Sequence, residues 1–358
     1  MSQPPPADPQ DGERPGSAEA PLGARPQRDL SGILVIAKPA GPTSHDVVAL
    51  VRRLSGLRRV GHGGTLDPFA SGVLPVFLGA ATRVVEYHMT DGKAYRAVVC
   101  FGARSTTDDL QGELVPGEGS PPQQSAVEAA LPLFRGTIVQ RPPDYSAVKV
   151  AGRRAYELAR RGEKPDLRER TVEIASLELT AWDGADPGRP CATLEVLCSA
   201  GTYVRALARD LGQALGCGAY LGALVRTASG PFRLADAVPL ETLRTAAAGG
   251  ALRSLVLPVD TGLELYPSVG LAAPEVASLA TGQVVRARGL QLPEPGPGGL
   301  VRIVDDGGRL VAMARLADGR LHPEKVFLAP VEAAMPRRGS GPDAGMVADT
   351  PQTARCGP

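Results

Sequence analysis

The sequence has few cysteines and no long apolar run. Its five cysteines form no Cys-x-x-Cys pair and no histidine cluster accompanies them, so we expect neither a disulfide framework nor a zinc site. No apolar stretch reaches the length of a membrane span, and the N-terminus lacks the apolar core of a signal peptide. These absences argue against a membrane protein and favour a reducing, cytoplasmic location.

Net charge is also nearly absent. The 39 basic and 38 acidic residues give a formal charge of +1, so any surface that binds RNA must be a local basic patch. Lysine occurs only five times, and the other basic residues are arginines, which suit bidentate phosphate contacts and base stacking. A general bias towards Ala, Gly, Pro and Arg explains most of this arginine excess.

The 358 residues, 43% of them hydrophobic, are enough for two domains with packed cores. Pro-, Gly- and Ser-rich composition predicts disordered tails at residues 1–30 and 333–358. Between the tails we expect a larger domain at 31–262 and a smaller one at 263–332. Short strands and the hairpin signal Asp306-Gly307 predict a small β-barrel in the second domain.

Within the larger domain, strand and helix patterns are mixed without regular βαβ alternation, which favours an α+β fold over a doubly wound sheet. Ser44 is a candidate cap for the first helix. The patterns predict strands at 33–36, 95–101, 172–180 and 192–198, and helices at 45–54, 123–134, 153–161 and 202–215.

The most informative run is residues 61–76, Gly-His-Gly-Gly-Thr-Leu-Asp-Pro-Phe-Ala-Ser-Gly-Val-Leu-Pro-Val. Its glycines let the backbone bend tightly and let another molecule approach. Pro68 fixes its own φ and disfavours the α region for Asp67, so the carboxylate lies on a stiff loop. Asp before Pro is common turn chemistry, and on this pattern alone Asp67 is either a structural cap or a reactive group.

The whole run resembles the signature of the TruB family of tRNA pseudouridine synthases, which act at position 55 in the T loop. The family pattern is Gly-His-Thr-Gly-(Thr/Ala)-Leu-Asp-Pro, and this chain departs from it at Gly63, where Thr is usual. The resemblance extends over about residues 33–235, through Lys38-Pro39, Gly79-x-Ala81-Thr82-Arg83, Lys93-Ala94-Tyr95-Arg96, Thr107-x-Asp109-x-x-Gly112, Pro142-Pro143-x-Tyr145, Ser199-x-Gly201-Thr202-Tyr203-Val204-Arg205 and Leu224-x-Arg226-Thr227-x-x-Gly230.

This resemblance implies a pseudouridine-synthase fold, a mixed sheet flanked by helices, and three catalytic residues. Asp67 corresponds to the nucleophile, which attacks the base at C6 or the sugar at C1′. Tyr95 corresponds to the tyrosine that stacks on the target base and helps to remove its proton. Arg205 corresponds to the arginine that pairs with the aspartate, and we expect it to lower the pKa of Asp67.

The resemblance also implies how the substrate is bound. The target uridine must be extruded from a folded loop, and His62 corresponds to the residue that fills the vacated stack. Tyr203 and Leu224 correspond to positions that line the pocket, and Lys38 and Arg83 are candidates for phosphate contacts. The reaction is an isomerisation that needs no cofactor and no metal. The expected partner is the T-stem-loop of tRNA, with no obligatory protein partner and a monomeric enzyme.

Two other functions stay open. A flipping pocket with a second RNA-binding domain could serve a non-catalytic tRNA-binding or tRNA-folding module, and the run 322–327 does resemble the end of a PUA RNA-binding domain. The intact Asp67, Tyr95 and Arg205 favour an enzyme. A guide-RNA-dependent synthase like dyskerin is the other alternative, but such proteins tend to have lysine-rich tails, and residues 1–30 and 333–358 contain no lysine.

Overall fold

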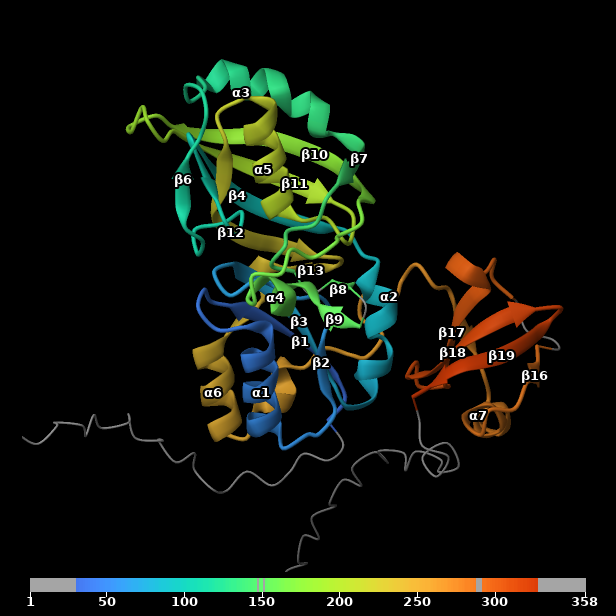
Figure 1. Cartoon of the computed structure of the whole chain (residues 1–358). Coiled ribbons are helices and arrows are strands. Elements are labelled where there is room, and N and C mark those ends of the chain that lie inside the picture. The colour runs from blue at the N-terminus through green and yellow to red at the C-terminus, as the bar shows by residue number, and fades with distance from the viewer. Residues whose placement is uncertain (1–29, 147, 151, 288–291, 328–358) are drawn as a thin grey trace, which may run out of the picture. The chain divides into compact units, whose positions relative to one another are not determined.

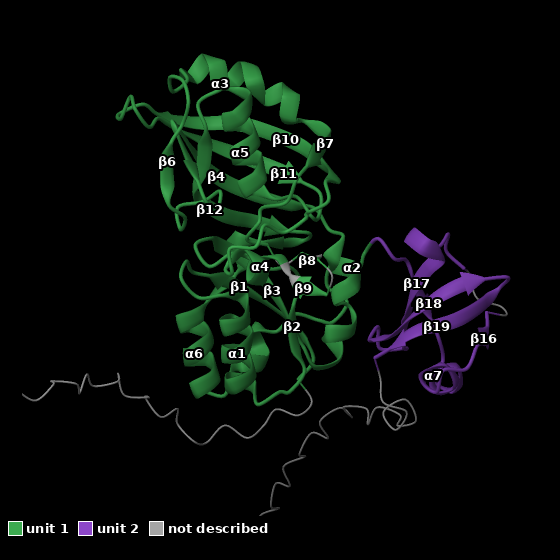
Figure 2. Ribbon diagram, in the orientation of Figure 1, with its two compact units in different colours: residues 1–264 green, residues 265–358 purple. Residues whose placement is uncertain are grey.

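The computed structural model describes residues 30–146, 148–150, 152–287 and 292–327. It divides the chain into two compact units, residues 1–264 and 265–358 (Figure 2). The predicted tails lie outside the described residues, with the exception of Leu30. Leu30 is only 1% exposed and packs in the core of the first unit, so the prediction that the tail reaches residue 30 is wrong at that residue.

The first unit is built on one ten-stranded mixed sheet (Figure 1). The pairs β1–β14 and β3–β12 are parallel and the others are antiparallel. The main path runs through β14 (Val238–Pro239), β1 (Gly32–Lys38), β3 (Ser71–Leu78), β12 (Ala219–Ser229), β4 (Lys93–Phe101), β11 (Cys191–Cys198), β10 (Arg170–Asp183) and β7 (Gly136–Gln140), with β2 (Val60–His62) beside β3 and β13 (Phe232–Arg233) beside β12.

Helices cover this sheet. The helix α5 packs against β12 and β4, and α1 and α6 lie together near β1 (Figure 1). The α-helices of the unit are α1 (Ser44–Ser55), α2 (Val85–Met89), α3 (Gln124–Ala130), α4 (Ala155–Ala159), α5 (Val204–Ala214) and α6 (Leu240–Ala248). Short 3₁₀ helices are η1 (Gly79–Arg83), η2 (Leu131–Phe134), η3 (Leu234–Asp236) and η4 (Leu252–Leu255), and small hairpins pair β5 (Ala103–Ser105) with β6 (Leu114–Pro116) and β8 (Lys149–Val150) with β9 (Arg153–Arg154).

Three predicted helices differ in detail. Thr43, not Ser44, caps α1: its Oγ1 accepts from the Asp46 N–H while Asp46 accepts from the Thr43 N–H, which closes a capping box. The helix predicted at 123–134 ends at Ala130 and continues as the 3₁₀ helix η2, which has Pro132 near its start. The helix predicted at 153–161 is shorter because residues 153–154 form β9.

The second unit has its own five-stranded sheet and its own apolar core. The Asp305 carboxylate accepts from the N–H groups of Gly307 and Arg309 and so closes the predicted hairpin turn. Together the two units confirm the α+β prediction. The sheet order is β15 (Ser268–Gly270), β17 (Leu300–Val304), β18 (Leu310–Ala317), β19 (Arg320–Val326) and β16 (Val285–Arg286), accompanied by α7 (Ala273–Ala280) and η5 (Pro297–Gly299).

The expectation of no disulfide is wrong for one pair. Cys100 on β4 lies opposite Cys191 on β11 in the antiparallel register, their Cα atoms are 4.1 Å apart, and the sulfurs are bonded. A sequence separation of 91 residues conceals this proximity from the sequence. The cysteine-based argument for a reducing compartment therefore falls. Separately, no helix of the described residues is long and apolar enough to cross a membrane.

One glycine controls how closely β3 approaches β12. Gly72 has φ +115°, and a Cβ there would lie 2.2 Å from the Arg226 carbonyl oxygen. Gly41 has a similar φ of +108°, but no atom of the described residues lies within 4 Å of its Cβ position. The comparison of these two sites separates backbone strain from a steric clash.

We therefore expect Gly72→Ala to destabilise the protein much more than Gly41→Ala. The control carries only the strain of a positive φ, on the order of 1–3 kcal/mol. Gly72→Ala adds a collision of the new methyl group with the backbone of β12 at Arg226. For this collision we expect a further loss of at least about 2 kcal/mol in the free energy of unfolding. Urea unfolding of the three proteins measures the difference. Equal losses in the two variants would show that the strands do not approach this closely.

Candidate active site

Asp67 lies on the connection between β2 and β3, two antiparallel strands. We call residues 63–70 of this connection the aspartate loop. Asp67 has a side chain that is 34% exposed, and its carbonyl accepts a hydrogen bond from the Ala70 N–H in a tight turn. The glycine-proline pattern thus forms the stiff loop that the sequence predicts.

Gly63 begins this loop, at the position where the family usually has Thr. Its N–H donates to the Pro75 carbonyl, and a Cβ at this position would lie 2.9 Å from the Phe77 ring. A threonine would therefore require Phe77 to move. In this chain the glycine and the large aromatic ring fit each other.

Buried polar groups from other elements hold the loop. The Ser44 hydroxyl both donates to the carbonyl of Leu66, at 3.0 Å, and accepts from its N–H, at 2.9 Å. The Lys38 ammonium donates to the carbonyls of Ala70, at 2.7 Å, and Pro68, at 3.4 Å. These contacts fix the backbone immediately before and after Asp67.

The predicted phosphate contact by Lys38 is wrong. The residue is 1% exposed and its ammonium bonds backbone carbonyls. Burial lowers the pKa of Lys38 to about 8; Asp67 opposes this shift and Arg226 adds to it. A short Lys-Pro motif at the end of a strand cannot reveal whether its ammonium points outwards or into the fold.

Arg205 lies in the first turn of α5, directly beside Asp67. Its Nε is 2.9 Å from the Asp67 carboxylate, and its side chain is 6% exposed. The guanidinium also donates to the carbonyls of Thr107, at 3.1 Å, and Tyr145, at 2.9 Å. The structure therefore brings together the aspartate and the arginine that the sequence paired.

A second carboxylate completes this group. Asp109 has a side chain that is 4% exposed, and one of its oxygens is 3.5 Å from the Arg205 guanidinium. Its other oxygen accepts from the Thr107 hydroxyl, at 2.6 Å, and the Gln111 N–H, at 2.9 Å. Arg205 thus bridges two acids. The sequence analysis quoted the Thr107-x-Asp109 motif but assigned it no role. The signal that could have identified Asp109 was its place within the series of motifs that match the family.

Arg205 lowers the pKa of Asp67 as expected, but the net pKa of the carboxyl is raised. The protein packed around the carboxylate removes enough water to raise its pKa, and this effect outweighs the lowering by Arg205. Asp109 raises the pKa further, whereas Lys38 lowers it. The sequence identified Arg205 as the charge partner. It could not show whether the lowering of the pKa by Arg205 or its raising by burial is the larger effect. A carboxylate with a raised pKa is more basic and is a typical feature of a reactive site.

Tyr95 and Leu224 pack beside the loop from neighbouring strands. Tyr95 on β4 is 9% exposed, Leu224 on β12 is 7% exposed, and both belong to the apolar cluster that contains Leu66 and Ala70. Burial raises the pKa of the Tyr95 phenol, while the positive charge of Arg226 opposes this shift. The predicted catalytic residue Tyr95 and the predicted pocket residue Leu224 therefore lie beside the aspartate loop.

His62 lies on β2 just before the loop. Its ring packs edge-on against His45, with centroids 5.7 Å apart, and its buried Nδ1 has no hydrogen-bond partner among the described residues. Burial lowers the pKa of His62, and the nearby His45 and Arg226 lower it further. The imidazole is therefore neutral near pH 7, which suits insertion between bases.

The remaining two predicted residues lie at the ends of helices. Tyr203 precedes α5, its N–H donates to Gln140, and its ring faces the Arg170 guanidinium at 5.6 Å. Arg83 is exposed at the end of η1 and stays a candidate for a phosphate contact. No direct contact with Asp67 is seen for either within the part of the chain that the structure describes.

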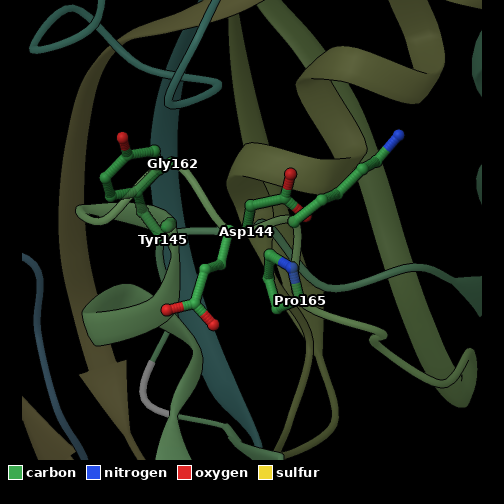
Figure 3. A pocket seen from close by; sticks show the side chains of 7 residues that line it. Asp144, Tyr145, Gly162 and Pro165 are labelled. Atoms are coloured by element: carbon green, nitrogen blue, oxygen red, sulfur yellow. The ribbon is translucent and has the colours of Figure 1, made fainter.

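A separate pocket is lined by residues that include Asp144, Tyr145, Gly162 and Pro165 (Figure 3). It shares one element with the site, because Tyr145, which lines it, also accepts from Arg205 through its carbonyl. None of the sequence-predicted site residues lines this pocket. Its walls are Asp144, Tyr145, Ala159, Gly162, Glu163, Lys164 and Pro165. Within the described ranges, no group of three or more His, Cys, Asp or Glu is arranged to hold a metal.

Comparison with known proteins identifies the family of this chain. Residues 52–204 match the N-terminal domain of the TruB family of pseudouridylate synthases. The chain belongs to the TruB family. Residues 205–264 match the C-terminal domain of tRNA pseudouridylate synthase B, and residues 267–327 match the C-terminal region of pseudouridine synthase II TruB.

Curated relatives cover most of this TruB-family chain. A tRNA pseudouridine synthase B of Rhodopseudomonas palustris is 43% identical over 325 residues, 89% of this chain and 86% of its own length. The protein of the same name from Pseudomonas aeruginosa is 43% identical over 307 residues, 85% of this chain and 98% of its own length.

Solved structures with this fold include a ribonucleoprotein and a protein complex. A chain from the structure of an H/ACA RNP bound to a substrate RNA containing 2'-deoxyuridine aligns with a TM-score of 0.63 and 27% identity, and covers 84% of this chain and 86% of its own. A chain from a Cbf5-Nop10-Gar1 complex gives a TM-score of 0.64 and 29% identity, and covers 85% of this chain and 87% of its own.

The raised pKa of Asp67 has a consequence for stability. A carboxyl whose pKa is higher in the folded than in the unfolded state destabilises the fold when it is ionised. This cost is fully present above the folded pKa and absent below the unfolded pKa. We therefore expect Asp67→Asn to be as stable as the parent protein or more stable at pH 7, and the difference to disappear as the pH falls towards 3.

Chemical unfolding at several pH values tests this expectation. Asp46→Asn is the control of opposite sign, because hydrogen bonds from Thr43 lower the pKa of Asp46. That variant should lose stability at pH 7, and its loss should shrink in acid. If Asp67→Asn is clearly less stable than the parent at pH 7, the carboxylate is a structural group.

Proposed function

We propose that this chain converts uridine to pseudouridine at position 55 in the T loop of tRNA, without a cofactor. The observation that carries the proposal is the environment of the Asp67 carboxylate. It is partly buried, its pKa is raised, and it pairs with Arg205, which Asp109 helps to hold in place. It occurs in a chain 43% identical to proteins named tRNA pseudouridine synthase B. The family membership supplies the reaction, and the geometry supplies the groups to perform it.

The reaction breaks the bond between N1 and C1′, forms a bond between C5 and C1′, and transfers the proton of C5. No atoms are gained or lost, so the site must provide a nucleophile, a place for the base to turn and a route for one proton. Asp67 in its ionised form is the nucleophile, and it attacks either C6 or C1′. Tyr95 stacks against the base and assists the transfer of the proton.

The target uridine has to leave the folded T loop before it reaches Asp67. Extrusion of a base costs a few kcal/mol, and the protein must offset this cost. His62 suits this role because it precedes the aspartate loop, it is neutral, and its Nδ1 has no partner among the described residues. Leu224 and Tyr203 complete the walls that receive the base, and Arg83 contacts a neighbouring phosphate.

A guide-RNA-dependent activity is the second candidate, because the structural neighbours include a Cbf5 complex and an H/ACA RNP. Their identity of 27–29% is lower than the 43% shared with proteins named for tRNA. We therefore favour an enzyme that acts alone, as a cytoplasmic monomer, on tRNA.

The direct test is incubation of the purified chain with an unmodified tRNA transcript, followed by mapping of pseudouridine. We expect one modified position, in the T loop, with no guide RNA or added protein. Asp67→Asn should abolish the product while tRNA affinity changes by less than about threefold, since the exchange of a carboxylate for an amide preserves shape. Turnover by the Asn variant would remove Asp67 as the nucleophile. A requirement for guide RNA would favour the second candidate.

The second unit is proposed to bind RNA in the manner of a PUA domain, outside the target loop. It carries exposed arginines, among them Arg286 and Arg320. Deleting residues 265–358 should then raise KM and leave kcat similar, with a shallower salt dependence, because each lost phosphate contact reduces the log–log slope by about 0.7–0.9. Thermal unfolding must first show that the truncated protein folds. An unchanged salt slope would contradict an RNA-binding role for this unit.

A further inference from the structure

Arg226 is the largest fully buried side chain of the described residues, only 1% exposed, and the family resemblance gives it no role. A buried cation normally has a carboxylate partner, because removing a charge from water is costly. Among the described residues Arg226 forms no ion pair. Its guanidinium instead donates to three backbone carbonyls.

These acceptors surround Asp67 in the chain. The guanidinium donates to the carbonyls of Val73 at 2.7 Å, Gly64 at 3.2 Å and Thr65 at 3.3 Å. Gly64 and Thr65 precede Asp67 and Val73 follows it on β3, while the charge of Arg226 also acts on the phenol of Tyr95. Arg226 therefore ties together the two sides of the aspartate loop and lies beside the tyrosine.

The sheet register explains how one side chain reaches all of them. Arg226 on β12 lies opposite Tyr95 on β4 on one side and opposite Gly72 on β3 on the other. β12 thus separates the strand that carries Tyr95 from the strand that follows the aspartate loop. Because Gly72 has no side chain, the two backbones approach closely there, and the guanidinium can extend along the loop.

We propose that Arg226 is a positioning residue that sets the Asp67 carboxylate relative to the ring of Tyr95. The inference rests on the proposed function, since it concerns the geometry of that reaction. A planar guanidinium with donors on several nitrogens can satisfy separated acceptors at once, whereas an ammonium is a single point of contact. Lysine at this position therefore retains the charge and loses the geometry.

The expected consequence is kinetic. A displacement of about 1 Å in a catalytic group can lower the rate about a hundredfold without contact with the substrate. Arg226 is buried beneath the loop and is not available to the tRNA, so its replacement should leave binding almost unchanged. A residue with a purely structural role would lower stability and affinity together with the rate.

The test is Arg226→Lys in the full chain, with unmodified tRNA transcript as substrate. We expect the single-turnover rate of pseudouridine formation to fall about 10–100-fold, while tRNA affinity stays within about threefold of the parent. The matched control is Arg135→Lys: Arg135 also donates two hydrogen bonds to a backbone carbonyl, that of Leu177, but none to the site. The control should keep its rate within about twofold.

A second measurement identifies what Arg226 acts through. In a Tyr95→Phe background the phenol hydroxyl on which the charge of Arg226 acts is absent, so Arg226→Lys should lower the rate by a smaller factor than in the parent. Multiplicative effects would show that Arg226 does not act on Tyr95, and would overturn the proposal.

The outcomes are distinguishable. A parent protein that forms no pseudouridine contradicts the proposed function, whereas an active parent with a fully active Arg226→Lys contradicts the positioning role alone. Arg226→Gln is the second variant, since it removes the buried charge and with it the cost of desolvation. If neither variant folds, or if affinity falls in step with the rate, Arg226 supports the fold and does not position the reaction.

Discussion

The ion pair between Asp67 and Arg205 is the contact around which the rest of the site is arranged. A salt bridge on the surface contributes little, because water competes for both charges. Here Arg205 is almost fully buried, and Asp67 is surrounded by protein on most sides. The guanidinium is therefore poorly solvated, and the carboxylates of Asp67 and Asp109 supply its counter-charge. Asp109 and the carbonyls of Thr107 and Tyr145 share the remaining donors of the guanidinium and keep it oriented.

This arrangement leaves the carboxylate in an environment less favourable than water. Burial dominates over Arg205 and raises the pKa of Asp67, so the fold does not gain stability from ionising it. The stability must come from elsewhere, chiefly from the apolar clusters on the faces of the ten-stranded sheet. A group that is costly to bury and yet held in position by many contacts is typical of a functional site.

Much of this organisation could be predicted from the sequence. The glycine-proline pattern predicted a stiff loop around Asp67, and the alternating run at Tyr95 predicted β4. The predictions that failed concern contacts between segments that are distant in the sequence. The Cys100–Cys191 pair follows from the register of β4 and β11, and the inward direction of Lys38 follows from the position of the loop above it. The sign of the Asp67 pKa shift depends on the depth of burial, which no local pattern records.

The pH dependence of the single-turnover rate tests the central claim most directly. Asp67 must be ionised to act as a nucleophile, and its pKa lies above the ordinary value of 3.8. We expect the rate to rise with pH through an apparent pKa above 3.8. This limb should move to higher pH in Arg205→Gln, which removes a lowering charge, and to lower pH in Asp109→Asn, which removes a raising one. A limb at or below 3.8, or shifts of the same sign in the two variants, would contradict the account.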